Sequence, residues 1–323
     1  LGATLSGITF ISVPGKVDDS AFSYMQMTMG FFFGYLIIAL ILIPLYYRMN
    51  LTSIYGYLKE RFGNSSYKTG ASFFLLSRLI GASLRLYIVA NVLQMAIMDS
   101  WGVPYIVTVL ITILLIWVYT FRSGIKTIIW TDTLQTLFML LAVGTSIYLI
   151  SDELNLGFTS LITTISESEY SQVFFWEGDQ HFFKQFFAGI FIAIVMTGLD
   201  QDMMQKNLSC RSQKDAQKNL YWFSGALVIV NLVFLSLGAL LYIYANQTVP
   251  PVEAKYDELF PAIALGGLGV GVGLIFILGL IAAAYSSADS ALTSLTTSFC
   301  VDILDFEKEG DQKKQIKTRK MIH

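Results

Sequence analysis

Oxygen-bearing side chains gather in one apolar segment near the end of the chain. Ala283 is followed there by a set of hydroxyl and carboxyl side chains, Ser286, Ser287, Asp289 and Ser290. Helical offsets of three and four residues place Ser286, Asp289 and Ser290 on one face. Hard cations take oxygen ligands, and an ionisable residue inside an apolar membrane helix by default marks an ion or solute path. The alternative for Asp289 is a neutral carboxyl in a hydrogen-bonded helix contact.

The opening stretch of the chain is rich in small and hydroxylated residues. Gly2, Thr4, Ser6, Gly7 and Thr9 fall within its first nine positions. Such a composition favours local unwinding, which frees backbone carbonyls for an ion near the middle of a membrane. The alternative is that these residues only allow helices to approach closely.

Three further charged residues lie inside apolar segments. Asp132 stands about one turn into its segment, where it binds an ion or only complements the helix dipole. Arg78 and Arg85 are seven residues apart and share one helix face. A guanidinium that faces the interior suits a carboxylate, so an anionic solute is favoured for Arg85. An ion pair with Asp200, Asp202 or another span is the alternative.

Constellations for catalysis or nucleic-acid binding are lacking. The only histidines are His181 and His323, and the glycine-rich run 266–273 has no Walker lysine and no preceding strand, so helix packing or flexibility explains it better than phosphate binding. Cys210 and Cys300 are expected to be reduced thiols. The sequence therefore predicts neither an enzyme nor a partner of nucleic acids.

These residues must be positioned by membrane helices. Of the 323 residues 54% are hydrophobic and 14% are charged, and the apolar residues form long runs. A bilayer core needs about 20 consecutive apolar residues per helix. About eight spans are predicted in a single transmembrane domain, 1–323, and the first one reads as a helix cut at its start rather than as a signal peptide. The predicted spans are residues 2–17, 23–47, 71–98, 103–120, 127–150, 185–205, 219–244 and 262–303.

The basic residues give these spans an orientation. Sixteen lysines and arginines lie in the segments 47–70, 121–126, 206–218 and 304–323, whereas the alternate connections hold only Lys16, Lys184 and Lys255. By the positive-inside rule the C-terminal end of this chain is cytoplasmic, in a multi-pass protein of the cell membrane. The acidic connection 152–182 then faces outward.

Five stretches together resemble the sodium:solute symporter family, which includes proline, glucose, iodide, vitamin and sialic acid symporters. They occur in the family's order and cover essentially the whole chain: Ala3–Pro14, Pro44–Tyr55 with Lys59–Phe62, Trp130–Gln135, Asp200–Lys206, and Ala283–Ser287 continuing to Val301–Leu304. The resemblance implies an all-α integral membrane protein with a five-plus-five inverted-repeat (LeuT-like) helix bundle. It also implies that the chain is truncated at both ends, with the second repeat incomplete.

Ion and solute sites follow from the same resemblance. The first sodium site of the family falls on the backbone carbonyls of three residues and the hydroxyls of two serines, namely Gly2, Leu5, Ala283, Ser286 and Ser287. A second sodium site, described for some members, falls on Asp132, Ser286, Asp289 and Ser290. Asp289 departs there from the hydroxyl of those relatives. Since two carboxylates around one monovalent ion disfavour double ionisation, sodium and a proton both stay open for this site.

The solute site is expected to use Thr4, Ser6, Thr9, Thr28 and Arg85. The three hydroxyls of the first span match those of sialic acid symporters, while Thr28 replaces a glutamine, and Gly81, one turn from Arg85, replaces an arginine. The hypothesis is sodium-coupled symport, with Na+ as the coupling ion, of a small anionic solute resembling sialic acid or a monocarboxylate, by alternating access. Proton-coupled symport by the same fold, a transporter-like solute sensor and a passive channel are the alternatives. The oligomeric state is left open.

Overall fold

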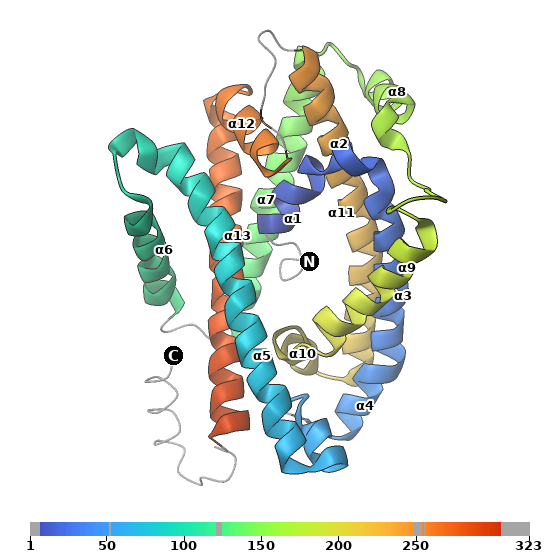
Figure 1. The fold of residues 1–323 in the computed structure, drawn as a ribbon, viewed down its shortest axis with the longest axis vertical. Coiled ribbons are helices and arrows are strands. Elements are labelled where there is room, and N and C mark those ends of the chain that lie inside the picture. The colour runs from blue at the N-terminus through green and yellow to red at the C-terminus, as the bar shows by residue number, and fades with distance from the viewer. Residues whose placement is uncertain (1–6, 52, 121–124, 248–253, 255, 305–323) are drawn as a thin grey trace.

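The computed structural model describes residues 7–51, 53–120, 125–247, 254 and 256–304, and no strand occurs among them. The helices form an elongated bundle (Figure 1). In chain order they are α1 (Gly7–Gly15), α2 (Val17–Ser20), α3 (Tyr24–Ile37), α4 (Ile43–Arg48), α5 (Gly56–Leu93), α6 (Tyr105–Thr120), α7 (Ile125–Glu153), α8 (Phe158–Glu167), α9 (Phe182–Ala193), α10 (Gln201–Leu208), α11 (Gln213–Gln247), α12 (Leu259–Gly266) and α13 (Val270–Ser298). Wider π-helical turns continue α3, α5, α9 and α13, at Ile38–Leu42, Gln94–Met98, Ile194–Gly198 and Phe299–Ile303.

Several of these helices are long and apolar enough to cross a membrane. Within the described residues four helical stretches qualify by length and composition: Val17–Arg48, Gly56–Trp101, Asp132–Glu153 and Gln213–Gln247. The bent pair Phe182–Gly198 and Gln201–Leu208 makes a fifth, and Tyr105–Val118 and Val270–Ala283 are shorter apolar helices. With α1, each of the eight segments predicted from the sequence contains a helix.

Two predicted spans are not the continuous helices that the sequence suggested. Segment 185–205 bends by 67° between Gly198 and Gln201, so that α10 leaves the direction of α9. Segment 262–303 contains the short α12 and then α13, which begins after Gly269. Gly269 has φ +83° and ψ 163°, a conformation that is essentially restricted to glycine. The glycine-rich run is thus a connection between two helices.

Helix α5 also departs from its predicted segment, 71–98, because it begins at Gly56. Gly63, with φ +85°, kinks α5, and the turn after this kink lies against the π-helical turn that follows α13. Tyr67 donates a hydrogen bond of 2.8 Å to Oδ1 of the buried Asp302, and Nζ of Lys68 donates to the carbonyl oxygens of Asp302 and Ile303 at 2.6 and 2.9 Å. These bonds join α5 to the last π-helical turn of the chain's described part.

Glycines let α3 and α9 approach closely. A Cβ atom on Gly30 would overlap the carbonyl oxygen of Phe186, and one on Gly189 would overlap the carbonyl oxygen of Met27. Helix α11 likewise packs against α1. In the predicted arrangement α1 and α3 open the first repeat, and α9 and α11 belong to the opening of the second. The first helix of each repeat therefore lies against the second helix of the other, as the inverted-repeat bundle requires.

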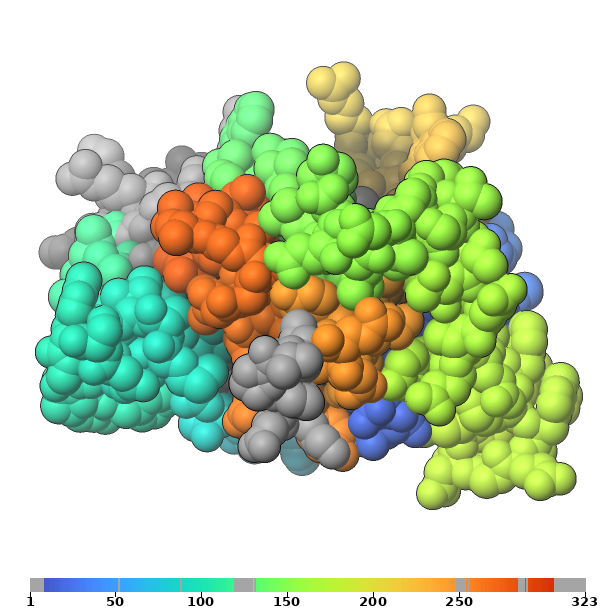
Figure 2. Space-filling view, turned by 90° about the horizontal axis from the view of Figure 1, so that it is seen from above, coloured from blue at the N-terminus to red at the C-terminus, as the bar shows by residue number. Residues whose placement is uncertain are grey.

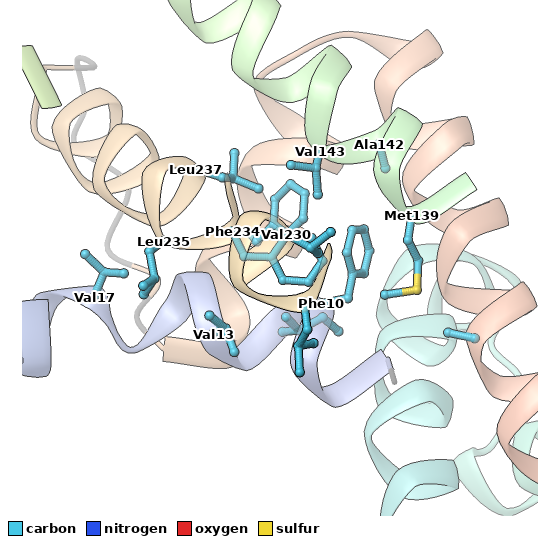
Figure 3. Close-up of a cluster of buried hydrophobic side chains, with 14 of the residues drawn as sticks. Phe10, Val13, Val17, Met139, Ala142, Val143, Val230, Phe234, Leu235 and Leu237 are labelled. Carbon is cyan, nitrogen blue, oxygen red and sulfur yellow. The ribbon is translucent and has the colours of Figure 1, made fainter. Parts of the chain in front are cut away.

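The apolar core joins α1, α7 and α11. Figure 3 shows Phe10 of α1 beside Phe234 of α11, with Met139 and Val143 of α7 facing them. The Phe10 ring also lies 5.1 and 5.3 Å, between ring centroids, from Phe260 and Phe276, and all four rings are buried. Packing of this kind fixes where α1 crosses the bundle.

The connection between α7 and α9 is partly helical and covers one end of the bundle. It contains α8 and a 3-10 turn at Glu169–Ser171. Figure 2 shows this segment, in green, spread over the end of the molecule next to α12, in orange. Gln26 of α3 ties the connection down, because its Nε2 donates to the carbonyl oxygen of Gln180 at 2.9 Å and its Oε1 accepts from the backbone of Phe175 at 3.2 Å.

Candidate ion and solute site

A lysine ammonium joins three helices at the centre of the candidate site. Nζ of Lys206, on α10, lies 3.1 Å from Oδ2 of Asp132 on α7 and donates to Oγ of Ser290 on α13 at 2.8 Å. The side chains of Lys206 and Asp132 are 18% and 14% exposed, and Ser290 is buried. Asp132 is therefore more than a helix-dipole partner, because it forms a largely buried ion pair with a residue 74 positions away.

This contact lies where the resemblance places a second sodium ion. The structure brings the predicted ligands Asp132 and Ser290 to one point, but both oxygens bind the Lys206 ammonium there. An ammonium carries three donors and one positive charge, so it satisfies the same oxygens that would coordinate a monovalent cation. The described residues at this point fit a lysine side chain and do not fit a sodium ion beside it. The side chain of Asp289 lies outside the described part.

The first predicted sodium site falls largely outside the described residues. This holds for Gly2 and Leu5 and for the side chains of Ser286 and Ser287, although both serines belong to helix α13. Ala283 is buried on α13, three residues before Ser286. This site stays a prediction.

The predicted solute residues lie on opposite sides of the bundle. Thr4 and Ser6 are outside the described residues, and Thr9 is half-buried on α1. Thr28 is buried on α3, and its hydroxyl donates to the carbonyl oxygen of Tyr24 at 3.0 Å. Arg85 is half-buried on α5, which Figure 1 shows across the molecule from α3. No hydrogen bond within the described part joins Thr28 to Arg85.

The two arginines of α5 have different surroundings. Arg78 is buried and forms ion pairs with Asp202, which is fully buried on α10, and with Asp200 at 3.8 Å. Arg85 has no carboxylate oxygen within 4.0 Å among the described residues. The alternative of an ion pair thus holds for Arg78, whereas the role of Arg85 in binding a solute stays a prediction.

The break between α9 and α10 is held by residues that the sequence reasoning did not single out individually. The hydroxyl of Tyr46 donates to the carbonyl oxygen of Gly198 at 2.9 Å, and that of Tyr55 donates to Leu199 at 3.4 Å. Oε1 of Gln201 accepts from the backbone N–H of Ile54 at 2.9 Å. Unwound backbone at membrane depth needs such protein partners.

A local signal for this break exists in the sequence. Asp200 caps α10, since its Oδ1 accepts from the backbone N–H of Met203 at 3.1 Å. Asp200 follows Thr197-Gly198-Leu199 inside an apolar run, and an Asp at such a point is a helix-start signal that marks a new helix within segment 185–205. Lys206 lies about two turns after this start, so its position in space depends on the direction of the new helix.

Comparison with known proteins identifies the class to which this bundle belongs. The family model of the sodium:solute symporter family matches residues 1–323. The chain belongs to this family, whose members are multi-pass transporters of the cell membrane. This membership confirms the expectation that the chain is not an enzyme.

Relatives within the family carry different solutes. The sodium/sialic acid symporter SiaT of Proteus mirabilis (strain HI4320) is 26% identical over 309 residues, which cover 93% of this chain and 61% of that protein. The sodium-dependent multivitamin transporter of Oryctolagus cuniculus is 27% identical over 316 residues, which cover 93% of this chain and 48% of that protein. The chain thus spans less than two thirds of the length of these relatives.

A solved structure shares the fold. A Na+-coupled sialic acid symporter in its substrate-bound outward-open state superimposes with a TM-score of 0.83 at 24% identity, covering 99% of this chain and 69% of that chain. This likeness confirms the predicted all-α membrane bundle of the inverted-repeat type.

Proposed function

We propose that the complete protein is a sodium-coupled symporter that carries a small anionic solute into the cell by alternating access. The observation that carries this proposal is the broken sixth segment, with the 67° bend between α9 and α10, in a chain of the sodium:solute symporter family. Transporters hold solutes and coupling ions at discontinuous helices near the bilayer midplane. The hydrogen bonds of Tyr46 and Tyr55 hold the broken backbone in place.

Sodium is the proposed coupling ion. The relatives are named as sodium-dependent symporters, and the predicted first site, Gly2, Leu5, Ala283, Ser286 and Ser287, supplies only oxygen ligands. This site would join α13 to the first segment, so that a bound ion favours the conformation that accepts the solute. Sodium drives uptake only as far as it binds that conformation more tightly than the other.

The proposed solute is an anion of the size of sialic acid or a monocarboxylate. Arg85 supports this choice, because it is half-buried and its neighbour Arg78 already has Asp202 and Asp200 as partners. A guanidinium binds a carboxylate through two parallel hydrogen bonds. The hydroxyls of Thr4, Ser6, Thr9 and Thr28 are the proposed neutral contacts.

The proposed orientation places the C-terminal end of this chain in the cytoplasm. The excess of lysine and arginine in alternate connections supports it, and the acidic connection with α8 then lies outside. Labelling of a cysteine introduced at exposed Ser160, with an impermeant maleimide added to intact cells, tests this orientation. Labelling only after the cells are opened would contradict it.

Thermal unfolding of the complete purified protein tests the proposed function. The midpoint is measured in sodium and in potassium, alone and with sialic acid, lactate and other small anions. A ligand that binds only the folded state stabilises it by RT ln(1 + [L]/Kd), about 2.7 kcal/mol at a hundredfold excess over Kd. Stabilisation by sodium that one anion deepens supports the proposal. Indifference to sodium contradicts it and leaves proton coupling or a sensor.

The Ser287→Ala variant tests the first sodium site. We expect a higher sodium concentration for half-maximal uptake and a nearly unchanged solute affinity at saturating sodium, because the hydroxyl is proposed to touch the ion and not the solute. An equal loss at every sodium concentration would remove Ser287 from the ion site.

A further inference from the structure

Lys206 brings a covalently attached positive charge to the point between Asp132 and Ser290. We propose that its ammonium takes the place of a second sodium ion there, so that this transporter carries a tethered cation at that position and binds sodium only elsewhere. What the inference says about transport rests on the proposed function. The competition between one ammonium and one sodium ion for the same oxygens does not depend on transport and can be measured by binding alone.

The geometry of the contact supports a replacement rather than a neighbouring charge. Nζ of Lys206 lies within hydrogen-bond distance of both oxygens, at 3.1 Å from Asp132 and 2.8 Å from Ser290. A sodium ion on the same two oxygens would have to enter the space that this nitrogen fills. It would also share the Asp132 carboxylate with an ammonium in a largely buried place, where two like charges repel more strongly than in water.

The bend in the sixth segment delivers this ammonium. Because α10 turns by 67° from α9, it packs against α13 and brings Lys206 towards α7. The last turn of α10 is closed by a local bond, since Oγ of Ser209 donates to the carbonyl oxygen of Lys206 at 2.7 Å. The ammonium is held by Asp132 and Ser290 and is covalently part of α10, so it cannot leave for either side of the membrane. A cation held in this way moves with α10 and is not transported.

The consequence is that this protein moves one sodium ion fewer per solute than a transporter that binds sodium at this position. A coupling ion at this position would be released inside together with the solute, whereas the Lys206 ammonium is part of the protein and stays with it. Removing the ammonium should open a new site for a monovalent cation, because Asp132 and Ser290 would keep their oxygens and lose their cation.

Counting bound sodium ions tests the proposal directly. The complete protein is purified as wild type and as the Lys206→Ala, Lys206→Arg and Lys214→Ala variants, the last being a control at an exposed lysine of α11. Equilibrium binding of ²²Na+ is measured at constant ionic strength with N-methyl-D-glucamine as the replacing cation. Thermal unfolding in the same series gives a second count, because stabilisation rises with the logarithm of sodium in proportion to the ions bound.

We expect Lys206→Ala to bind one more sodium ion per protein than the wild type, and Lys206→Arg and Lys214→Ala to bind as many as the wild type. An unchanged count in Lys206→Ala overturns the proposal. Asp132→Asn in the otherwise wild-type protein provides a second test in case Lys206→Ala does not fold. This variant should keep every bound sodium, and the loss of one would also overturn the proposal.

The outcomes separate this inference from the proposed function. If the wild type binds no sodium while Lys206→Ala binds one ion, the tethered cation is supported and sodium coupling is wrong. If the wild type and Lys206→Ala bind the same number of ions, and that number is not zero, sodium coupling survives and the tethered cation is wrong.

Discussion

Arg78 of α5 and Asp202 of α10 form a buried ion pair across the centre of the bundle, and Asp202 is completely removed from solvent. Asp200, at the start of α10, lies 3.8 Å from the same guanidinium. The pair therefore connects α5 to the helix that follows the break between α9 and α10. Burying two charges is costly unless each satisfies the other, so loss of one partner leaves an uncompensated charge.

The variant Asp202→Asn tests the importance of this pair for stability. We expect it to destabilise the folded protein by about 3–5 kcal/mol, the usual cost of breaking a buried ion pair by removing one partner. The measurement is the thermal or denaturant unfolding midpoint in detergent. The exposed pair of Lys184 with Asp179 is the matched control, and Asp179→Asn should change little. Equal effects of the two variants would show that burial of the Arg78 pair has no special weight.

Gly30→Ala tests the close packing of α3 on α9. The added methyl group would overlap the carbonyl oxygen of Phe186, which belongs to the backbone and cannot turn away. We expect a loss of about 1–3 kcal/mol in stability, as for other overpacked positions. Gly225→Ala on α11 is the control, because nothing lies within 4 Å of its added methyl group. A Gly30→Ala protein as stable as Gly225→Ala would contradict the close approach.

Gly269→Ala tests the connection between α12 and α13. The φ of +83° with ψ of 163° is strained for any residue with a Cβ atom, at a cost of about 1–3 kcal/mol. Gly271→Ala, two residues further on and inside α13, meets nothing within 4 Å and should be neutral or slightly stabilising. The measurement is the unfolding midpoint of each variant. A loss only in Gly269→Ala supports a conformation that requires glycine, whereas equal effects of the two substitutions would indicate that the run provides only flexibility.

Arg85→Gln tests the proposed anion contact. The loss of a charge-assisted hydrogen bond of about 1.5–3 kcal/mol should weaken solute affinity by about 10- to 150-fold, with little change in sodium binding. Binding is measured by solute-dependent thermal stabilisation in saturating sodium. Arg61→Gln is the control, since Arg61 is exposed and lies over the ring of Tyr57. Unchanged affinity in Arg85→Gln would exclude this guanidinium as the anion contact.

Cys210 offers a chemical probe of the connection between α10 and α11. Burial raises the pKa of its thiol, and the nearby Asp215 carboxylate raises it further. Because the thiolate is the reactive form, alkylation near neutral pH should be slower than that of a free thiol and should rise with pH through a midpoint above the usual range. Rates are measured in a Cys300→Ser background. Asp215→Asn should accelerate the reaction, and a slower reaction would contradict the effect of this charge.

The residue types of the chain determined its class without any structure. Eight apolar segments, the lysines and arginines in alternate connections, and five motifs in the family's order predicted a member of the sodium:solute symporter family and its fold, which the family match and the shared fold confirm. Hydropathy and motifs suffice for this because a bilayer selects helices by composition within one segment. The motif Pro44–Tyr55 was recognised in the same way. The structure shows that its residues Tyr46 and Tyr55 donate hydrogen bonds to the backbone at the break between α9 and α10.

The contacts within the site were decided by the tertiary structure. The resemblance to the family placed Asp132 and Ser290 near one ion, yet Lys206 joins them from a helix whose direction depends on the 67° bend. The same bend gives Arg78 its partners while leaving Arg85 without a carboxylate among the described residues. Composition reports what a segment contains, whereas the meeting of side chains 74 or 84 positions apart depends on the direction in which a broken helix continues, which no local pattern specifies.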